Sequence, residues 1–537
     1  MPSRVLRVMV VTALVCAATF TAEVGPGKGP GKGPEALADA LAVLKVNDPR
    51  LLDREVTQFA AGLGVNPAPL RSAMANLLFR SRSLDGIDLA RPALMAWRPQ
   101  EPSLVAIIPL SDRRSFLESF GAGFAGDAPL IRVGERDGTV VFTQNGNDGL
   151  LEYRLLVSDR AAYLASTTAL CRELAEYPLQ TLTSEAPLMF TASSEFLMRL
   201  SAQSDDLSSD LTPEQRKATE ALAPGIVGMQ KATRAGMQAF LGQLLSAELS
   251  VRPDAQGTMN FALQLQAKPD SALAVWIANQ RNSPSRLLPI VRSEHSAFTV
   301  SGNIVWQGQA ERLGRVFTEV LKESYAERWT PMVDENWIAL WNLLDRAGPF
   351  ALAADVDLKN GKPISESRYL GDQPRAQEVM SLITLVSQSL TGTVGEAVAA
   401  GSATGYREQD PAGERVLVSN ERHLVSVQSS MRSAVEVATE LVTRSQTTGA
   451  PEGQAGVLQV STNLTPLIRT LAVLMGGEVQ PGLPTAICGL NIKTGLPGQL
   501  IAEGTFPAPA VAQLFRDSGL IQFSDNPEAV PPPRKRR

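Results

Sequence analysis

Apolar and polar residues alternate along several short stretches of the chain. In Asn260–Ala267, the apolar Phe261, Leu263 and Leu265 alternate with small or polar residues. This period of two predicts a strand with one buried and one solvated face. The preceding Arg252–Gly257 carries Pro, Asp and Gly, which supply turn dihedrals, so we expect a hairpin and an antiparallel sheet with one solvated face. Further turns of this composition are Asn145–Gly149 and Lys359–Lys362.

Helical patterns are interspersed with these strands. Ser111–Gly121 begins with a serine that can cap a helix, and Ser166–Pro178 ends at a proline. The longest pattern, Leu211–Leu245, offers Thr212 as a cap and has a kink expected at Pro224. Helices packed on one face of antiparallel sheets define an α+β fold, which is the class that we predict.

One stretch of the sequence has a close echo much later in the chain. LLVSDRAAYLAS at Leu155–Ser166 corresponds to VLVSNERHLVSV at Val416–Val427. Three further matches follow in the same order: Arg91–Trp97 with Gly348–Ala354, Ala186–Leu200 with Gly456–Leu471, and Glu248–Ile277 with Gly489–Phe515. The period is too long for a solenoid repeat and suits two domains, so the sequence predicts two tandem duplicated modules.

The resulting domain organisation has seven segments. In chain order they are a signal peptide (1–22), a Gly/Pro/Lys spacer (23–34), an N-terminal helical segment (35–84), the first α+β module (85–283), linking strands and helices (284–347), the second module (348–523) and a disordered Pro-rich and basic tail (524–537). The second module is shorter than the first at the helical pattern after Thr212. If the two modules differ in function, we expect that helix to be the place where they differ.

The N-terminal residues resemble a secretory signal peptide. Arg4 and Arg7 precede the apolar run Val8–Ala18, and small residues follow. We expect cleavage near Ala18 to Ala22 and an extracytoplasmic location, either periplasmic or secreted. An uncleaved anchor is the alternative, but the apolar stretch is shorter than the ~20 residues of a spanning helix, so we expect no transmembrane span in the mature chain. Lipidation at Cys16 is a third interpretation.

Charge and rare residues limit the possible chemistry. The formal net charge of the 537 residues is -5, and basic clusters are spread out, so a nucleic-acid partner is not expected. The chain has two histidines, His295 and His423, and neither has a neighbouring ligand at metal spacing. Removal of the signal peptide leaves Cys171 and Cys488, which are either two buried thiols or a disulfide. We assign no catalytic, cofactor-binding or metal-binding residue and predict no cofactor.

A few local patterns have both a functional and a structural interpretation. GAGFAG at Gly121–Gly126 matches a dinucleotide-binding motif, but it follows a helical pattern instead of a strand, so we interpret it as a helix stop and a loop. Asp355 and Asp357 share one face of a strand, as a cation site requires, although a solvated face is the preferred interpretation. Trp337 and Trp341 could stack on a sugar, but their helical spacing favours buried packing.

The motif GIDLARP (Gly86–Pro92) leads into a strand pattern, and PLSDRRSFLESFG (Pro109–Gly121) follows it. This arrangement resembles uncharacterised secreted bacterial proteins with tandem α+β modules. The resemblance implies an envelope or extracellular protein and transfers no catalytic residue. We therefore expect an exported, non-enzymatic binding or scaffold protein of the bacterial envelope, whose partner is an unknown envelope protein or ligand. The alternative is a periplasmic carrier of an apolar ligand held between sheet and helices, with Met229 and Met237 lining the site. The third candidate is a hydrolase with no recognisable motif.

Overall fold

The computed structural model describes most of the chain between residues 37 and 518. Within this range it leaves out 38, 100–102, 122–128, 147–148, 178–185, 204–237, 312–313, 316–317, 319–321, 323–327, 360, 393, 411–412, 448–449 and 476–481. The predicted signal peptide, spacer and basic tail lie outside the described residues. The same holds for Thr212, Met229, Met237 and most of GAGFAG.

The described strands fall into two sets along the chain. The first set is β1 (Ala42–Val46), β2 (Ala93–Trp97), β3 (Leu104–Pro109), β4 (Ile131–Arg136), β5 (Thr139–Gly146), β6 (Gly149–Val157), β7 (Ala161–Ala165), β8 (Leu188–Ser193), β9 (Leu244–Pro253) and β10 (Met259–Ala267). The second set is β12 (Ser296–Gly302), β13 (Phe350–Lys359), β14 (Lys362–Asp372), β15 (Glu396–Ala400), β16 (Ala403–Asp410), β17 (Gly413–Ser419), β18 (His423–Ser429), β20 (Leu458–Asn463), β21 (Ile487–Thr494) and β22 (Gln499–Phe506). Two short strands, β11 (Ser283–Ser285) and β19 (Glu452–Gly456), pair separately.

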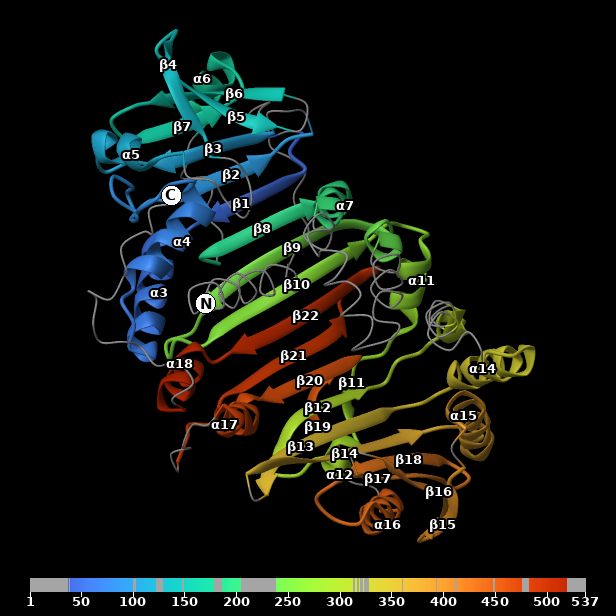
Figure 1. Ribbon diagram of the computed structural model, residues 1–537. Helices are drawn as coiled ribbons and strands as arrows, with labels where there is room; N and C mark the ends of the chain where they lie inside the picture. The colour runs from blue at the N-terminus through green and yellow to red at the C-terminus, as the bar shows by residue number, and fades with distance from the viewer. Residues whose placement is uncertain are drawn as a thin grey trace, which may run out of the picture.

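These two sets form one sheet of twenty strands, in which every neighbouring pair is antiparallel (Figure 1). The order across the sheet is β4-β5-β6-β7-β3-β2-β1-β8-β9-β10-β22-β21-β20-β12-β13-β14-β18-β17-β16-β15. The last strands of the two sets, β10 and β22, pair over eight residues and join the two halves. The predicted α+β class with an antiparallel sheet is confirmed.

The two halves have the same strand order. Outward from the β10–β22 junction, the first half contains β10, β9, β8, β1, β2, β3, β7, β6, β5 and β4, and the second contains β22, β21, β20, β12, β13, β14, β18, β17, β16 and β15. When the strands of each half are numbered in chain order, strands with the same number occupy the same position relative to the junction in both halves. The four pairs of matching sequence segments also lie on equivalent strands. The two halves therefore share both the strand order and these local sequence similarities.

Two segments expected outside the modules contribute strands to the sheet. Residues 35–84, expected to be helical, contain β1, which lies between β2 and β8. Residues 284–347, expected to link the modules, contain β12 in the equivalent place between β13 and β20. Each half of the sheet therefore begins earlier in the chain than the predicted module does.

Local sequence signals account for several turns and helix ends. Asp254, in the turn between β9 and β10, accepts hydrogen bonds from the backbone N–H groups of Gln256 (2.8 Å) and Thr258 (3.0 Å). The helix expected to start at Ser111 is capped instead by Asp112, whose carboxylate accepts from the N–H of Arg114 at 2.8 Å. The Ser111 hydroxyl instead donates to the carbonyl of Ile87 at 3.3 Å, so the helix begins one residue later than expected.

Helices lie along the sheet and at the ends of its strands (Figure 1). They are α3 (Pro49–Leu63), α4 (Ala68–Phe79), α5 (Arg113–Ser119), α6 (Thr168–Ala175), α7 (Ser194–Gln203), α11 (Ala272–Asn279), α12 (Leu288–Val291), α14 (Pro331–Leu344), α15 (Ala376–Thr391), α16 (Ala434–Ser445), α17 (Leu464–Leu474) and α18 (Ala508–Asp517).

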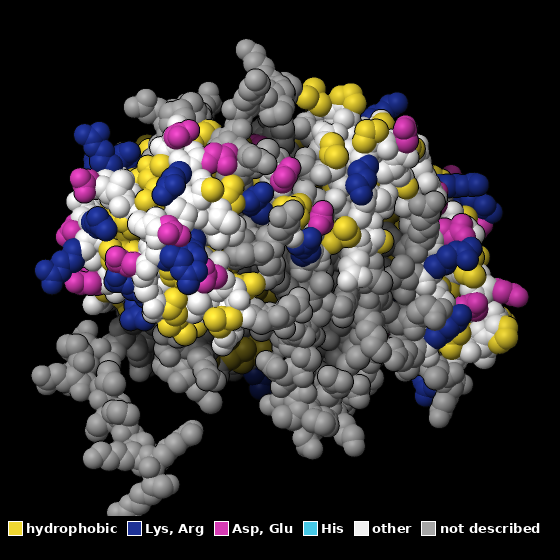
Figure 2. Space-filling model, turned by 90° about the horizontal axis from the view of Figure 1, so that it is seen from above, with side chains coloured by type: hydrophobic (Ala, Val, Ile, Leu, Met, Phe, Trp, Pro, Cys, Tyr) yellow, Lys and Arg dark blue, Asp and Glu magenta, His cyan; other side chains and the backbone are white. Residues whose placement is uncertain are grey.

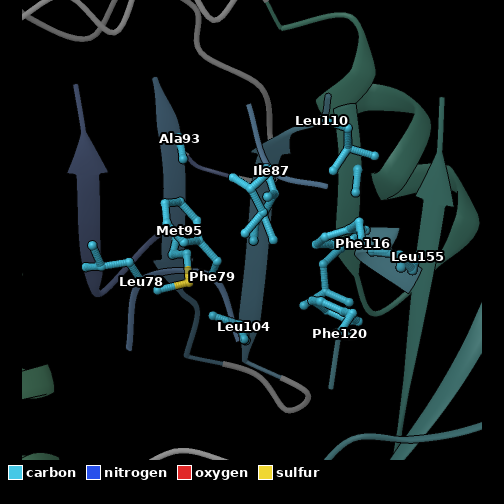
Figure 3. Close-up of a cluster of buried hydrophobic side chains, with 14 of the residues drawn as sticks. Leu78, Phe79, Ile87, Ala93, Met95, Leu104, Leu110, Phe116, Phe120 and Leu155 are labelled. Carbon is cyan, nitrogen blue, oxygen red and sulfur yellow. The ribbon is translucent and has the colours of Figure 1, made fainter. Parts of the chain in front are cut away.

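Buried clusters lie on both faces of the outer strands. In the first half, Met95 of β2 packs in a cluster with Phe79 of α4 and Phe116 of α5 (Figure 3), whereas the adjacent Leu94 packs with Leu174 of α6. In the second half, α12 and α16 pack in one cluster and α14 and α15 in another. The sequence predicts helices on one face, but β2 and β3 contain runs of buried residues without alternation, which is typical of strands covered on both sides.

Candidate binding surface

Six central strands carry two rows of apolar side chains across the junction between the halves. The register of β8, β9, β10, β22, β21 and β20 aligns one row as Leu188, Val251, Phe261, Gly504, Leu490 and Val460. It aligns the second row as Phe190, Leu249, Leu263, Ala502, Ile492 and Leu458. Directly paired residues of antiparallel strands project to the same face, so both rows belong to one face of the sheet. We call these twelve residues the central apolar face.

Water reaches part of this face. Of its ten large side chains, Leu249 and Val251 are buried, and the other eight are half-buried. The outer strands differ, because large side chains such as Ile107 and Leu155 are fully buried there. A strand spacing of about 4.8 Å makes the six-strand face about 24 Å wide between its outermost strands. The central apolar face is thus a broad apolar surface whose side chains are less buried than those of the hydrophobic core.

The junction at the middle of this face depends on a close contact. Phe261 of β10 is paired with Gly504 of β22, and a Cβ added at Gly504 would overlap the Phe261 ring. Glycine therefore lets the ring lie directly over the backbone of the neighbouring strand. The neighbouring pair, Leu263 with Ala502, again combines a large with a small side chain. The two halves therefore meet through large side chains of β10 and small residues of β22.

The opposite face of the same strands is mostly polar. Gln499 of β22 donates a side-chain hydrogen bond to Gln264 of β10, and both are buried. Lys493 of β21 pairs with Glu503 of β22 at 2.5 Å. These residues alternate along their strands with members of the central apolar face. The central sheet is amphipathic, and the apolar rows are confined to one side.

A cluster of aromatic side chains extends the central apolar face beyond β8, further into the first half. Phe190 of β8 contacts Trp97 of β2 edge to face, with ring centroids 6.2 Å apart. Phe196 of α7 contacts both rings, at 5.6 Å from Trp97 and 5.9 Å from Phe190. Figure 1 shows α7 and α11 at one end of the central strands and α18 and α17 at the other. Helices thus flank the central strands at both ends.

The two strand carboxylates noted in the sequence do not form a shared site. Asp355 is buried, pairs with Arg368 at 2.5 Å and accepts hydrogen bonds from Ser293 and Ser296, both at 2.8 Å. Asp357 is exposed. Burial of Asp355 differs from the solvated strand face that the sequence favours. The cause is Arg368 on the neighbouring strand, whose contribution a sequence pattern does not reveal. Asp355 is therefore part of a structural ion pair.

His423 lies near a serine and an aspartate. Its Nδ1 is 3.4 Å from Oγ of Ser445, and Asp372 is its cross-strand partner. However, the Ser445 hydroxyl donates to the carbonyl of Val442 at 2.8 Å, and Asp372 is held by Arg422 at 2.8 Å. Burial lowers the pKa of His423. The serine proton is directed away from the imidazole, so this arrangement does not activate a nucleophile.

The remaining candidate residues are dispersed. His295 is exposed beside Glu294, and Cys171 and Cys488 are free thiols, the first buried and the second half-buried. Burial raises the pKa of Cys171 to about 11. In the described ranges, no three His, Cys, Asp or Glu residues come together as metal ligands.

The tryptophan pair and the glycine motif have structural surroundings. Trp337 and Trp341 make an edge contact with centroids 5.7 Å apart, and the Trp337 indole N–H donates to the Gly314 carbonyl at 3.2 Å. Gly121, the first residue of GAGFAG, follows α5 and donates its N–H to the carbonyl of Arg80 at 2.9 Å. A helix precedes the motif where a dinucleotide site requires a strand.

A surface depression of about 490 Å³ lies between α5 and β4. It is lined by Asp112, Arg113, Arg114, Leu117, Glu118 and Arg132. Most of these charges are engaged, because Arg114 pairs with Glu118, and Arg132 with Glu135. On the face shown in Figure 2, basic and acidic side chains are likewise interspersed. The central apolar face is the better candidate for binding.

Comparison of the chain with family models, with curated proteins and with solved structures finds no match. Among the helices that the structure describes, none is long and apolar enough to cross a membrane.

Sequence reasoning detected the strand that carries Phe261 and Leu263 but not the surface to which they belong. Their alternation predicts one apolar face on a single strand. The two rows arise only when β10 pairs with β22, more than 230 residues later in the chain. The sequence did carry one signal of this surface. The segment Glu248–Ile277 matches Gly489–Phe515, and the two segments contain the equivalent strands β9–β10 and β21–β22.

Proposed function

We propose that this chain is an exported, non-enzymatic binding protein that holds an apolar ligand, such as a lipid acyl chain, against the central apolar face. The observation that supports this proposal is the pair of apolar rows that cross the β10–β22 junction, in which eight of the ten large side chains are half-buried. Apolar surface of this extent costs free energy while water contacts it, about 25 cal/mol for each Å². Binding an apolar molecule removes that cost, and contiguous apolar patches commonly mark binding sites.

Export is supported by the arrangement of Arg4, Arg7 and the apolar run that follows. We also propose that the two halves arose by tandem duplication, supported by their common strand order and the four sequence matches. In this interpretation, joining two copies through β10 and β22 doubled the length of the apolar rows. A scaffold that binds another envelope protein is the second candidate, and it uses the same face.

Native mass spectrometry of the protein purified from its own host tests the ligand proposal. We expect an additional mass of lipid size that dissociates at higher collision energy and is extracted by organic solvent. Protein that carries no such mass, and that also fails to take up a fluorescent fatty acid, would contradict the carrier function. Capture of a defined envelope protein by the same material would favour the scaffold.

A further inference from the structure

The twenty-stranded sheet has two terminal strands, β4 and β15. Among the described residues, β4 pairs only with β5, and β15 pairs only with β16. The two occupy equivalent places, as the outermost strand of each half. The outer edge of a terminal strand presents backbone N–H and C=O groups to solvent and can pair with another strand.

The β4 edge has the features that prevent such pairing. Four of its six residues are Arg132, Gly134, Glu135 and Arg136, and its register with β5 shifts between Arg132 and Gly134. Charged side chains and irregular register on an edge strand oppose the addition of another strand. This end of the sheet is protected.

The β15 edge lacks these features. Its sequence is Glu-Ala-Val-Ala-Ala, and its register with β16 is regular over all five residues. Its one charged residue, Glu396, is engaged by Arg407 at 2.5 Å. Ala397 and Ala399 are exposed, and the nearby Val394 is 76% exposed.

The β15 strand is also held firmly in place. Ala400 belongs to the buried cluster that includes Val437 and Leu441 of α16, and the partly buried Val398 packs against this cluster. A strand fixed by packing on one face loses little conformational freedom when a new strand joins its edge. The edge is therefore preorganised for pairing.

We propose that β15 pairs with β15 of a second copy of this chain, antiparallel and about a two-fold axis at Val398. In this register Ala397 lies opposite Ala399, and Glu396 opposite Ala400, so no like charges face each other. The near-palindromic sequence fits the self-complementary interface of a two-fold dimer. The alanines offer no side-chain pockets for the specific recognition of an unrelated peptide.

The proposed dimer repeats a join that the chain already makes. The two halves associate through antiparallel edge pairing of β10 with β22 in the middle of the sheet, and the dimer extends the sheet by the same kind of pairing at its β15 end. A pairing of five residues buries less than the standard interface of about 1,600 Å², so we expect a weak dimer with a dissociation constant in the micromolar range. This inference does not depend on the proposed ligand.

Sedimentation velocity of the purified protein up to about 100 μM tests the dimer, because an interface of this size is weak. We expect a concentration-dependent dimer. The double variant Ala397→Lys/Ala399→Lys places lysines opposite lysines and should weaken the dimer at least tenfold. The variant Ala397→Glu/Ala399→Glu should do the same, and an equimolar mixture of the two variants should form a heterodimer. The matched control Ile131→Lys/Val133→Lys on β4 should leave the dimer unchanged.

Several results would overturn the proposal. These are a monomer at every concentration, a dimer that both β15 variants retain, a mixture of Lys and Glu variants that does not associate, or a dimer lost only in the β4 variant. The substituted side chains of Ala397 and Ala399 are exposed, so folding is expected to persist. Circular dichroism of each variant checks this. Hydrogen exchange that slows at residues 396–400 as concentration rises would locate the interface.

Discussion

At the scale of single residues, the second half contains a buried network of charges. Asp355 pairs with Arg368, and Glu366 on the neighbouring strand accepts from Arg432 Nε at 3.1 Å. Asp355, Glu366 and Arg368 are each at most 6% exposed. Removing one member of a buried pair leaves the other charge without compensation, and this cost exceeds the net benefit of the pair. Substitution of a single member of this network is therefore expected to destabilise the protein.

We predict that Asp355→Asn lowers the free energy of unfolding by about 3 kcal/mol, because Arg368 loses its principal counter-charge in a buried site. The matched control is Asp357→Asn, two residues along the same strand and exposed, which should change the free energy by less than about 0.5 kcal/mol. Urea denaturation followed by circular dichroism measures both. Equal effects of the two substitutions would show that burial of the ion pair is not important.

A second residue-scale prediction concerns Cys171. Burial raises its pKa to about 11, and the thiolate is the reactive form. At pH 8 such a thiol holds about one hundredth of the thiolate of a thiol with a pKa near 9. We therefore expect negligible alkylation of Cys171 by iodoacetamide in the folded protein at pH 8 and full alkylation after unfolding in urea. Mass spectrometry of tryptic peptides measures the modified fraction. Rapid modification of the folded protein would contradict the buried placement.

At the scale of elements, the pairing of β10 with β22 connects the two halves. Phe261 lies over Gly504 within this pairing. We predict that Gly504→Ala destabilises the protein by about 1–3 kcal/mol, because the added methyl group overlaps the Phe261 ring and one of the two must move. Thermal or urea unfolding of the variant measures the effect.

Two comparisons give this prediction a control. Gly489→Ala on the adjacent β21 should have a smaller effect, because its nearest neighbour is a side-chain oxygen of Thr505 at 3.2 Å. In the double variant Phe261→Ala/Gly504→Ala, the two changes should be non-additive by at least about 0.5 kcal/mol, since removal of the ring relieves the overlap. Additive effects would mean that the two residues do not contact each other.

Element-scale features show which parts of the fold the sequence could predict. The hairpin at Arg252–Gly257 and the cap of α6 at Thr167 follow from residues close in sequence, and both were predictable. The insertion of β1 between β2 and β8 was not, because it depends on pairing with Leu188–Ser193, far along the chain. The uninterrupted apolar run of Leu104–Pro109 did carry a signal of burial on both faces.

At the scale of the whole molecule, the two halves share one sheet and one apolar surface. Each half alone supplies three strands of the central apolar face, and the rows become continuous only across the junction. Alternation along Asn260–Ala267 could reveal one strand of that surface but not its extent, because the partner strand is distant in sequence. The proposed ligand site is therefore a property of the joined halves.

The most direct test of the proposed function compares two truncations of equal size on opposite faces of the junction. Leu263→Ala removes a side chain from the central apolar face, and Ile501→Ala removes one from the polar face of the adjacent strand. Both side chains are half-buried. Titration of each purified variant with a fluorescent fatty acid measures the dissociation constant. We predict that it rises about tenfold or more for Leu263→Ala, as expected for the loss of about 1.4 kcal/mol of apolar contact, and stays within about twofold of the unsubstituted protein for Ile501→Ala. Equal dissociation constants for the two variants would contradict binding at the central apolar face.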